Sequence, residues 1–167
     1  MRHIIGIRLQ NEAGALARVA AMFSSRGFNI ESLSVAPTAE AGVSRLTLVT
    51  TGADAVIQQI VSQLNKLVDV VAIDDMTGGE HVERELLLAR VLPGEGGAEP
   101  LRRYVQDCGG RVLESEAGGT VVELVGSEAA VSGFLAGLAA RTTLIDVARS
   151  GALGVARRAG GKPGSVP

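Results

Sequence analysis

Two short segments near the N-terminus carry residues able to bind a small zwitterion. The first, residues 11–16 (Asn-Glu-Ala-Gly-Ala-Leu), leads from a predicted strand into a predicted helix. Gly14 has no Cβ, so a ligand can approach the backbone, and the N–H groups of Gly14, Ala15 and Leu16 stand at a helix N-terminus, where the helix dipole favours a carboxylate. We predict a carboxylate site here, with Asn11 as N-cap or turn residue. An ordinary strand-to-helix turn is the alternative.

The second segment, residues 26–33 (Arg-Gly-Phe-Asn-Ile-Glu-Ser-Leu), is where that helix ends at Gly27 and a new strand begins at Ile30. The amide of Asn29 can donate to a carboxylate and accept from an ammonium group, so it suits an amino acid. The alternative is a loop residue that bonds its own backbone. Together the two segments favour a small-molecule sensor over a catalyst.

Other polar residues give no sign of catalysis. The sequence has no G-x-S-x-G, H-E-x-x-H, G-x-x-x-x-G-K or G-x-G-x-x-G motif. His3 and His81 are far apart in the chain, and we expect both at the surface. Cys108, the single cysteine, falls on the apolar stripe of a predicted helix, and we expect it in the core. We therefore expect no catalytic residues and no metal ligands.

Composition narrows the class of protein. The 167 residues carry a net charge of −2, which argues against a nucleic-acid partner because such proteins usually carry a basic surface. No signal-peptide pattern and no apolar run near ~18 residues occurs, so we expect a cytoplasmic protein with no membrane partner. Aromatic residues make up 2% of the chain and hydrophobic residues 46%, so the core must consist of aliphatic side chains.

The hydrophobic periodicity predicts four helices, each with one apolar stripe at i, i+3, i+4, i+7. Their stripes span residues 16–23, 57–64, 101–108 and 131–138. Strands are predicted at Ile4–Leu9, Ile30–Ala36, Ser44–Thr51, Val70–Asp74, Glu85–Val91, Arg111–Ser115, Thr120–Val125 and Thr143–Ala148. The order β-α-β-β-α-β therefore occurs twice, which predicts an α+β protein of two tandem ferredoxin-like units.

Turn-rich composition sets the expected boundaries. We expect a first domain at residues 1–76, a linker at 77–82, a second domain at 83–156 and a disordered tail at 157–167. Because helices cover one face of each sheet, the other face or an edge needs cover, and dimerisation would supply it.

Six ordered stretches give the sequence a family resemblance. The chain resembles the small, regulatory subunits of acetolactate synthase (acetohydroxyacid synthase) over roughly residues 2–158, most specifically at Asn11–Val19, Arg26–Thr38, Ser44–Arg45, Gln63–Val70, His81–Glu85 and Asp146–Gly151. The resemblance implies that the first unit is an ACT domain, a ferredoxin-like unit that binds amino acids, and that such domains pair side by side in a homodimer.

The resemblance also implies a function. The chain would activate a separate catalytic subunit and confer feedback inhibition by valine in branched-chain amino-acid (valine, isoleucine, leucine) biosynthesis. Asn11, Gly14, Ala15 and Leu16 of one protomer would face Asn29 and Ile30 of its partner across the valine site, with Leu16 and Ile30 lining the isopropyl pocket. Thiamine diphosphate, Mg²⁺ and FAD would belong to the catalytic subunit, and this chain would bind no cofactor.

Three other classes of protein remain as alternatives. A free-standing ACT-domain amino-acid sensor or transcriptional regulator would share the effector site, but the regulator needs a DNA-binding element. An RNA-binding ferredoxin-like protein needs aromatic residues on its central strands, where this sequence has Val, Leu and Thr. A ferredoxin-like metallochaperone needs a C-x-x-C pair, and a small ferredoxin-like enzyme needs a catalytic Arg/Asn loop.

Overall fold

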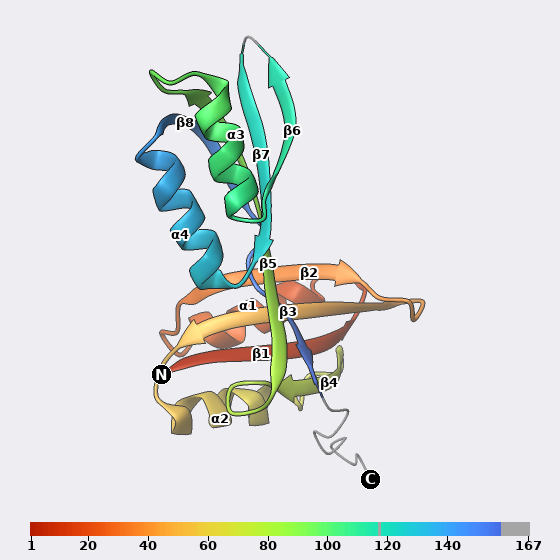
Figure 1. The fold of residues 1–167 in the computed structure, drawn as a ribbon. Coiled ribbons are helices and arrows are strands. Elements are labelled where there is room, and N and C mark those ends of the chain that lie inside the picture. Colours follow the sequence, from red (N-terminus) through yellow and green to blue (C-terminus); the bar gives the residue numbers. More distant parts are fainter. Residues whose placement is uncertain (117, 158–167) are drawn as a thin grey trace. The chain divides into compact units, whose positions relative to one another are not determined.

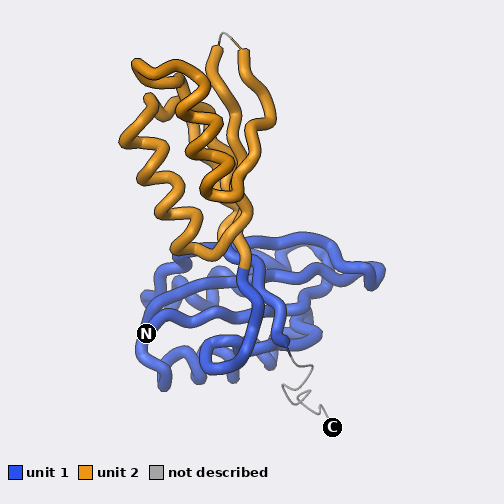
Figure 2. Tube along the Cα trace, in the orientation of Figure 1, with its two compact units in different colours: residues 1–83, 152–167 blue, residues 84–151 orange. Residues whose placement is uncertain are grey.

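The computed structural model describes residues 1–116 and 118–157 as two compact units. One unit comprises Met1–Glu83 with the segment from Ala152 onward, and the other comprises Arg84–Gly151 (Figure 2). The contacts thus group residues 77–83 and 152–157 with the first unit, which differs from the expected boundaries. The expected tail lies outside the described residues apart from Arg157.

The elements follow the predicted order, and the prediction of two tandem βαββαβ units is confirmed (Figure 1). The first unit contains β1 (Arg2–Gln10), α1 (Ala15–Ser24), β2 (Ile30–Pro37), β3 (Val43–Thr51), α2 (Asp54–Leu64) and β4 (Val70–Asp75). The chain continues with β5 (His81–Pro93), α3 (Ala98–Asp107), β6 (Arg111–Glu116), β7 (Gly119–Gly126), α4 (Glu128–Ala139), β8 (Thr142–Arg149) and β9 (Leu153–Ala156).

The sheet of the first unit is antiparallel with the strand order β2-β3-β1-β4, so β2 and β4 are its edges. Strands β1 and β3 are central, and their alternate aliphatic residues face the helices. There they meet the apolar stripes of α1 and α2 in one buried cluster: Ile5, Ile7, Leu9, Leu46 and Leu48 from the strands, and Val19, Phe23, Ile57, Ile60 and Leu64 from the helices. This cluster holds α1 against the sheet through Val19 and Phe23.

The other face of this sheet is covered in part by the chain itself. Ala152, after β8, is 5% exposed and packs in a buried cluster with Ile4, Val49 and Met76. Its N–H donates to Ser32 Oγ on β2 at 2.9 Å, and Arg45 Nη2 on β3 donates to the carbonyl oxygen of Gly154 at 3.0 Å. We call residues 152–157 the strap. The strap therefore supplies part of the cover that dimerisation was expected to give.

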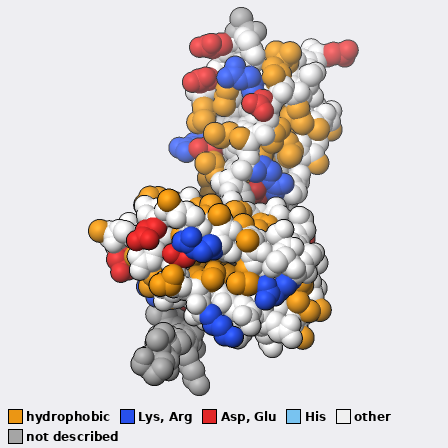
Figure 3. Space-filling model, turned by 180° about the vertical axis from the view of Figure 1, so that it is seen from behind, with side chains coloured by type: hydrophobic (Ala, Val, Ile, Leu, Met, Phe, Trp, Pro, Cys, Tyr) orange, Lys and Arg blue, Asp and Glu red, His pale blue; other side chains and the backbone are white. Residues whose placement is uncertain are grey.

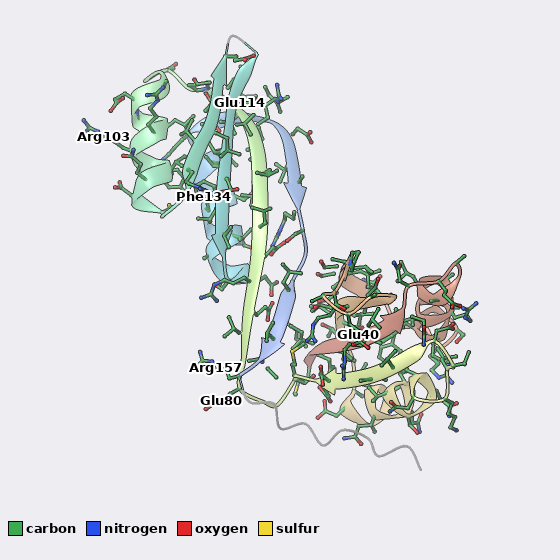
Figure 4. All side chains as sticks on the ribbon, turned by 90° about the vertical axis from the view of Figure 1, so that its right-hand side faces the viewer. Glu40, Glu80, Arg103, Glu114, Phe134 and Arg157 are labelled. Carbon is green, nitrogen blue, oxygen red and sulfur yellow. The ribbon has the colours of Figure 1, made fainter. Side chains whose placement is uncertain are left out.

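The strap also pairs with β5, whose first residues belong to the first unit. Strand β9 pairs with β5, and the N–H of Arg157 donates to the carbonyl oxygen of Glu80 at 2.9 Å. Glu80 and Arg157 lie close together where the two segments meet (Figure 4). No sequence periodicity marks β9, because its position depends on pairing with a strand some 70 residues earlier in the chain.

The second unit has an antiparallel sheet of order β6-β7-β5-β8. Tyr104 on α3 stacks on Phe134 of α4 with ring centroids 5.5 Å apart, and its hydroxyl donates to the Phe134 carbonyl oxygen at 3.0 Å. A Cβ at Gly137 would lie 1.9 Å from the Tyr104 hydroxyl, so a side chain there is excluded. Cys108 is exposed at the C-cap of α3, and the prediction that it packs in the core is wrong because α3 ends before its stripe reaches that residue.

Candidate functional site

The turn between β1 and α1 holds the first group of predicted site residues. Gly14 is the N-cap of α1 and has φ of 87°, a left-handed conformation that favours glycine. Asn11 therefore lies in the turn rather than at the N-cap, and its N–H donates to the carbonyl oxygen of Gly42 at 2.8 Å. The position of Gly14 leaves the first turn of α1 without a side-chain cap. The N–H of Ala15 donates to the carbonyl oxygen of Glu12 at 3.3 Å, so of the three predicted N–H groups those of Gly14 and Leu16 are left for an external acceptor.

The first helical residues divide between the core and the surface. Ala15 is 2% exposed and packs inward, whereas the Leu16 side chain is 39% exposed. The apolar stripe of α1 that reaches the core is Ala15, Val19 and Phe23. Leu16 is therefore an apolar side chain beside the open N–H groups, available to contact a ligand or another chain.

The turn between α1 and β2 holds the second group. Gly27, with φ of 70°, ends the helix, and the N–H of Phe28 donates to the Phe23 carbonyl oxygen at 3.1 Å. Thr50 Oγ1 donates to the backbone oxygen of Asn29 at 2.7 Å, so β3 holds the backbone there. The Asn29 side chain is exposed, whereas Ile30 is half-buried and packs against the core cluster. The pairing register of β2 with β3 shifts between Ile30 and Ser32, which marks a β-bulge at this end.

The two groups of residues lie at opposite ends of α1. The helix has 10 residues, so its ends are about 15 Å apart at 1.5 Å per residue. One amino acid cannot bridge that distance. Within a single chain the structure therefore does not bring Asn11–Leu16 and Asn29–Ile30 together.

The β2 edge of the first sheet is open and apolar. Leu33 and Val35 are 37% and 41% exposed, and they pair with Leu48 and Leu46, whose side chains lie in the helix-side core. On the face of the first unit seen in Figure 3, hydrophobic side chains lie exposed beside Lys and Arg. The other edge, β4, ends in Asp74 and Asp75, and acidic residues discourage strand pairing.

A charged pair missed by the sequence reasoning stands next to Gly14. Arg18 Nε donates to Asp69 Oδ2 at 2.5 Å, and Arg18 Nη2 donates to Asp69 Oδ1 at 2.8 Å. Hydrogen bonding to Arg18 lowers the pKa of Asp69, and hydrogen bonding to Asp69 raises the pKa of Arg18. The sequence signal for Arg18 was its spacing of four residues from Gly14, because residue i+4 of a helix leans back over residue i.

Metal and membrane features are lacking in what the structure describes. Within residues 1–116 and 118–157, no three His, Cys, Asp or Glu side chains come together as a metal site would require. None of the helices in those ranges has both the length and the apolar character needed to cross a bilayer.

Comparison with known proteins identifies the family. The model of the AHAS small subunit-like ACT domain matches residues 5–72, and the model of the small subunit of acetolactate synthase matches residues 84–158. The chain belongs to the family of acetolactate synthase small subunits. The first unit is thus an ACT domain, as the family resemblance implied, and the turns at both ends of α1 belong to it.

Relatives of this small-subunit family match nearly the whole chain. The acetolactate synthase isozyme 3 small subunit of Salmonella typhimurium is 41% identical over 157 residues, which cover 94% of this chain and 96% of the relative. The probable acetolactate synthase small subunit of Archaeoglobus fulgidus is 37% identical, covering 94% and 98%. The crystal structure of the small subunit from Thermotoga maritima superposes with a TM-score of 0.86 at 29% identity, covering 95% and 98%.

Proposed function

We propose that this chain is the regulatory subunit of an acetolactate synthase, which activates a separate catalytic subunit and makes it sensitive to feedback inhibition by valine. Membership of the small-subunit family supports the catalytic partner. The ACT domain supports an amino-acid effector. Thiamine diphosphate, Mg²⁺ and FAD would then be bound by the catalytic subunit.

We further propose that the effector site is shared by two copies of this chain. The observation that carries this proposal is the separation of the two groups of residues by the length of α1. If two β2 edges pair antiparallel about a two-fold axis, the N-terminus of one α1 comes beside the C-terminus of the other. Asn11 and Gly14–Leu16 would then face Asn29 and Ile30 of the partner subunit.

The exposed groups suit valine in such a dimer. The N–H groups of Gly14 and Leu16 would receive the carboxylate, and the Asn29 amide would contact the carboxylate and the ammonium group. Leu16 and Ile30 would cover the isopropyl group. Because both chains contribute, valine would change how they pack, and a coupling free energy of ~1–3 kcal/mol would suffice to alter activity.

Mixing two variants that each fail to bind valine tests the shared site. Gly14→Asp and Asn29→Ala each damage one half of the site, so homodimers of either variant should lose valine binding. A mixed dimer, formed by unfolding and refolding the two together, would have one intact site, because the unaltered halves come from different chains. We expect calorimetric valine binding to return on mixing and not when either variant is refolded alone.

Activity assays test the rest of the proposal. A thermal-shift screen of the twenty amino acids should show stabilisation by valine, and addition of the chain to a catalytic subunit should raise activity and make it valine-sensitive. Binding without activation would favour a free-standing sensor. If no amino acid binds and activity does not change, the proposed function is wrong.

A further inference from the structure

Arg18 is held in place by a carboxylate from a distant part of the chain. Asp69 precedes β4, and its side chain is 6% exposed, whereas that of Arg18 is 48% exposed. The backbone oxygen of Asp69 also accepts from the N–H of Gln10 at 2.8 Å. A buried carboxylate with two hydrogen bonds to one guanidinium fixes the plane of that group.

The pairing with Asp69 leaves one nitrogen of the guanidinium for another partner. Asp69 accepts hydrogen bonds from Nε and Nη2. Within residues 1–116 and 118–157, Nη1 donates no hydrogen bond. A Cβ at Gly14 would lie 2.9 Å from Nη1. The free N–H groups of Nη1 are therefore next to the backbone of Gly14, on the exposed side of the ion pair.

We propose that Arg18 is a further ligand of the effector, with Nη1 binding the carboxylate of an α-amino acid seated over Gly14 and Asp69 acting as the positioning residue. This inference rests on the proposed function. An arginine can bind two carboxylates at once because its five N–H groups point along different edges of the plane. A carboxylate over Gly14 would thus meet a charged donor as well as the N–H groups of the helix.

Glu12 is the other acidic residue whose charge acts on Arg18. It lies in the exposed turn, and its negative charge favours the same guanidinium that a bound carboxylate would contact. Its replacement by Gln should leave valine affinity unchanged or raise it. That behaviour separates Glu12 from a ligand of the ammonium group, whose loss would weaken binding.

The second unit provides a matched control for the loss of a buried ion pair. Arg149 Nε donates to Glu85 Oε1 at 2.7 Å and Arg149 Nη2 donates to Glu85 Oε2 at 2.6 Å. The Glu85 side chain is 7% exposed and that of Arg149 is 35% exposed. This pair has the same two-bond geometry as Arg18–Asp69 but belongs to the other compact unit.

The test uses double variants of the full chain, because removing one partner of a buried ion pair leaves an unpaired charge. Arg18→Gln with Asp69→Asn is compared with Arg149→Gln with Glu85→Gln. Each is titrated calorimetrically with L-valine and with L-valinamide, in which an amide replaces the carboxylate. Thermal melts verify that each variant folds, and Arg18→Lys replaces the first double variant if that one does not.

The expected result is a loss of discrimination between the two ligands. Removing a charge-assisted hydrogen bond should weaken valine binding by about ten- to a hundredfold, and the preference for valine over valinamide should fall by about the same factor. The control double variant, Arg149→Gln with Glu85→Gln, should keep the wild-type valine affinity and the wild-type preference for valine over valinamide. Equal weakening of both ligands would show a purely structural role and overturn the inference. If the wild type binds neither ligand, the proposed function itself has failed.

Discussion

Gly14→Asp tests the carboxylate site directly because it places a carboxylate where the effector's carboxylate is expected. Gly14 has φ of 87°, and a non-glycine residue in that conformation costs about 1–2 kcal/mol. The new Cβ would be 2.9 Å from Arg18 Nη1, so the guanidinium must shift or pair with the introduced carboxylate, which contributes about 0–1 kcal/mol at an exposed position. We expect a net loss of about 1 kcal/mol in the free energy of unfolding, which a folded domain tolerates.

The effect of Gly14→Asp on valine should be far larger than its effect on folding. Two carboxylates at one site repel by several kcal/mol, so valine affinity should fall at least about a hundredfold. Activation of the catalytic subunit should remain. The assay is acetolactate formation against valine concentration, with thermal unfolding as the check on folding.

Gly109→Asp is the matched control for backbone strain. Gly109 has φ of 74°, nothing lies within 4 Å of the position that a Cβ would take there, and it belongs to the second unit. It should lose a similar amount of stability and keep full valine sensitivity. A folded Gly14→Asp variant that remains valine-sensitive would refute the site, and a Gly109→Asp variant that loses sensitivity would show that strain alone is responsible.

Three further predictions concern stability and reactivity. Gly154→Val should destabilise the first unit by about 1–3 kcal/mol in urea unfolding, because a Cβ there meets Met76 Cε at 2.8 Å, whereas Gly133→Val inside α4, with open space around its Cβ position, should not destabilise the protein, because glycine is the poorer helix former. The pKa of Asp69 is lowered by Arg18, so its stabilisation is present above about pH 4 and is lost as the pH falls below that; Asp69→Asn should flatten the acid limb of stability against pH, and an unchanged limb would contradict this. Cys108 is exposed, so the native protein should react with a thiol reagent as fast as the unfolded chain, within about tenfold.

Local pattern was enough to predict the helices and strands of this fold apart from β9. The 3.6-residue stripes of α1 and α2 and the alternation of β1 and β3 each reflect one buried face, and that face is the core cluster around Ile7 and Phe23. Gly14 and Gly27 were informative for the same reason, because both adopt positive φ at the ends of α1. What depends on neighbours in sequence was therefore predictable.

Features that depend on residues far apart in the chain could not be predicted in this way. His3 is 3% exposed, with Nε2 3.2 Å from the Gly52 oxygen and 3.4 Å from Asp54 Oδ1, so the expectation that it lies at the surface is wrong. It is buried because it shares the helix-side face of β1 at the start of α2. The pair Arg18–Asp69 and the strap also join residues 51 or more positions apart, and periodicity carries no information at that separation.

The candidate site occupies an intermediate position between these two cases. Its residues are predicted from local chemistry and from the family resemblance, but no single chain can assemble them, because α1 holds Gly14 and Asn29 about 15 Å apart. A helix packed rigidly on a sheet cannot shorten to close that gap, whereas a two-fold axis beside β2 would close it at no cost to the fold. The same rigidity would give the proposed shared site regulatory potential: a ligand held between two fixed helix ends could relax only by moving one chain against the other, and a catalytic subunit could detect that displacement.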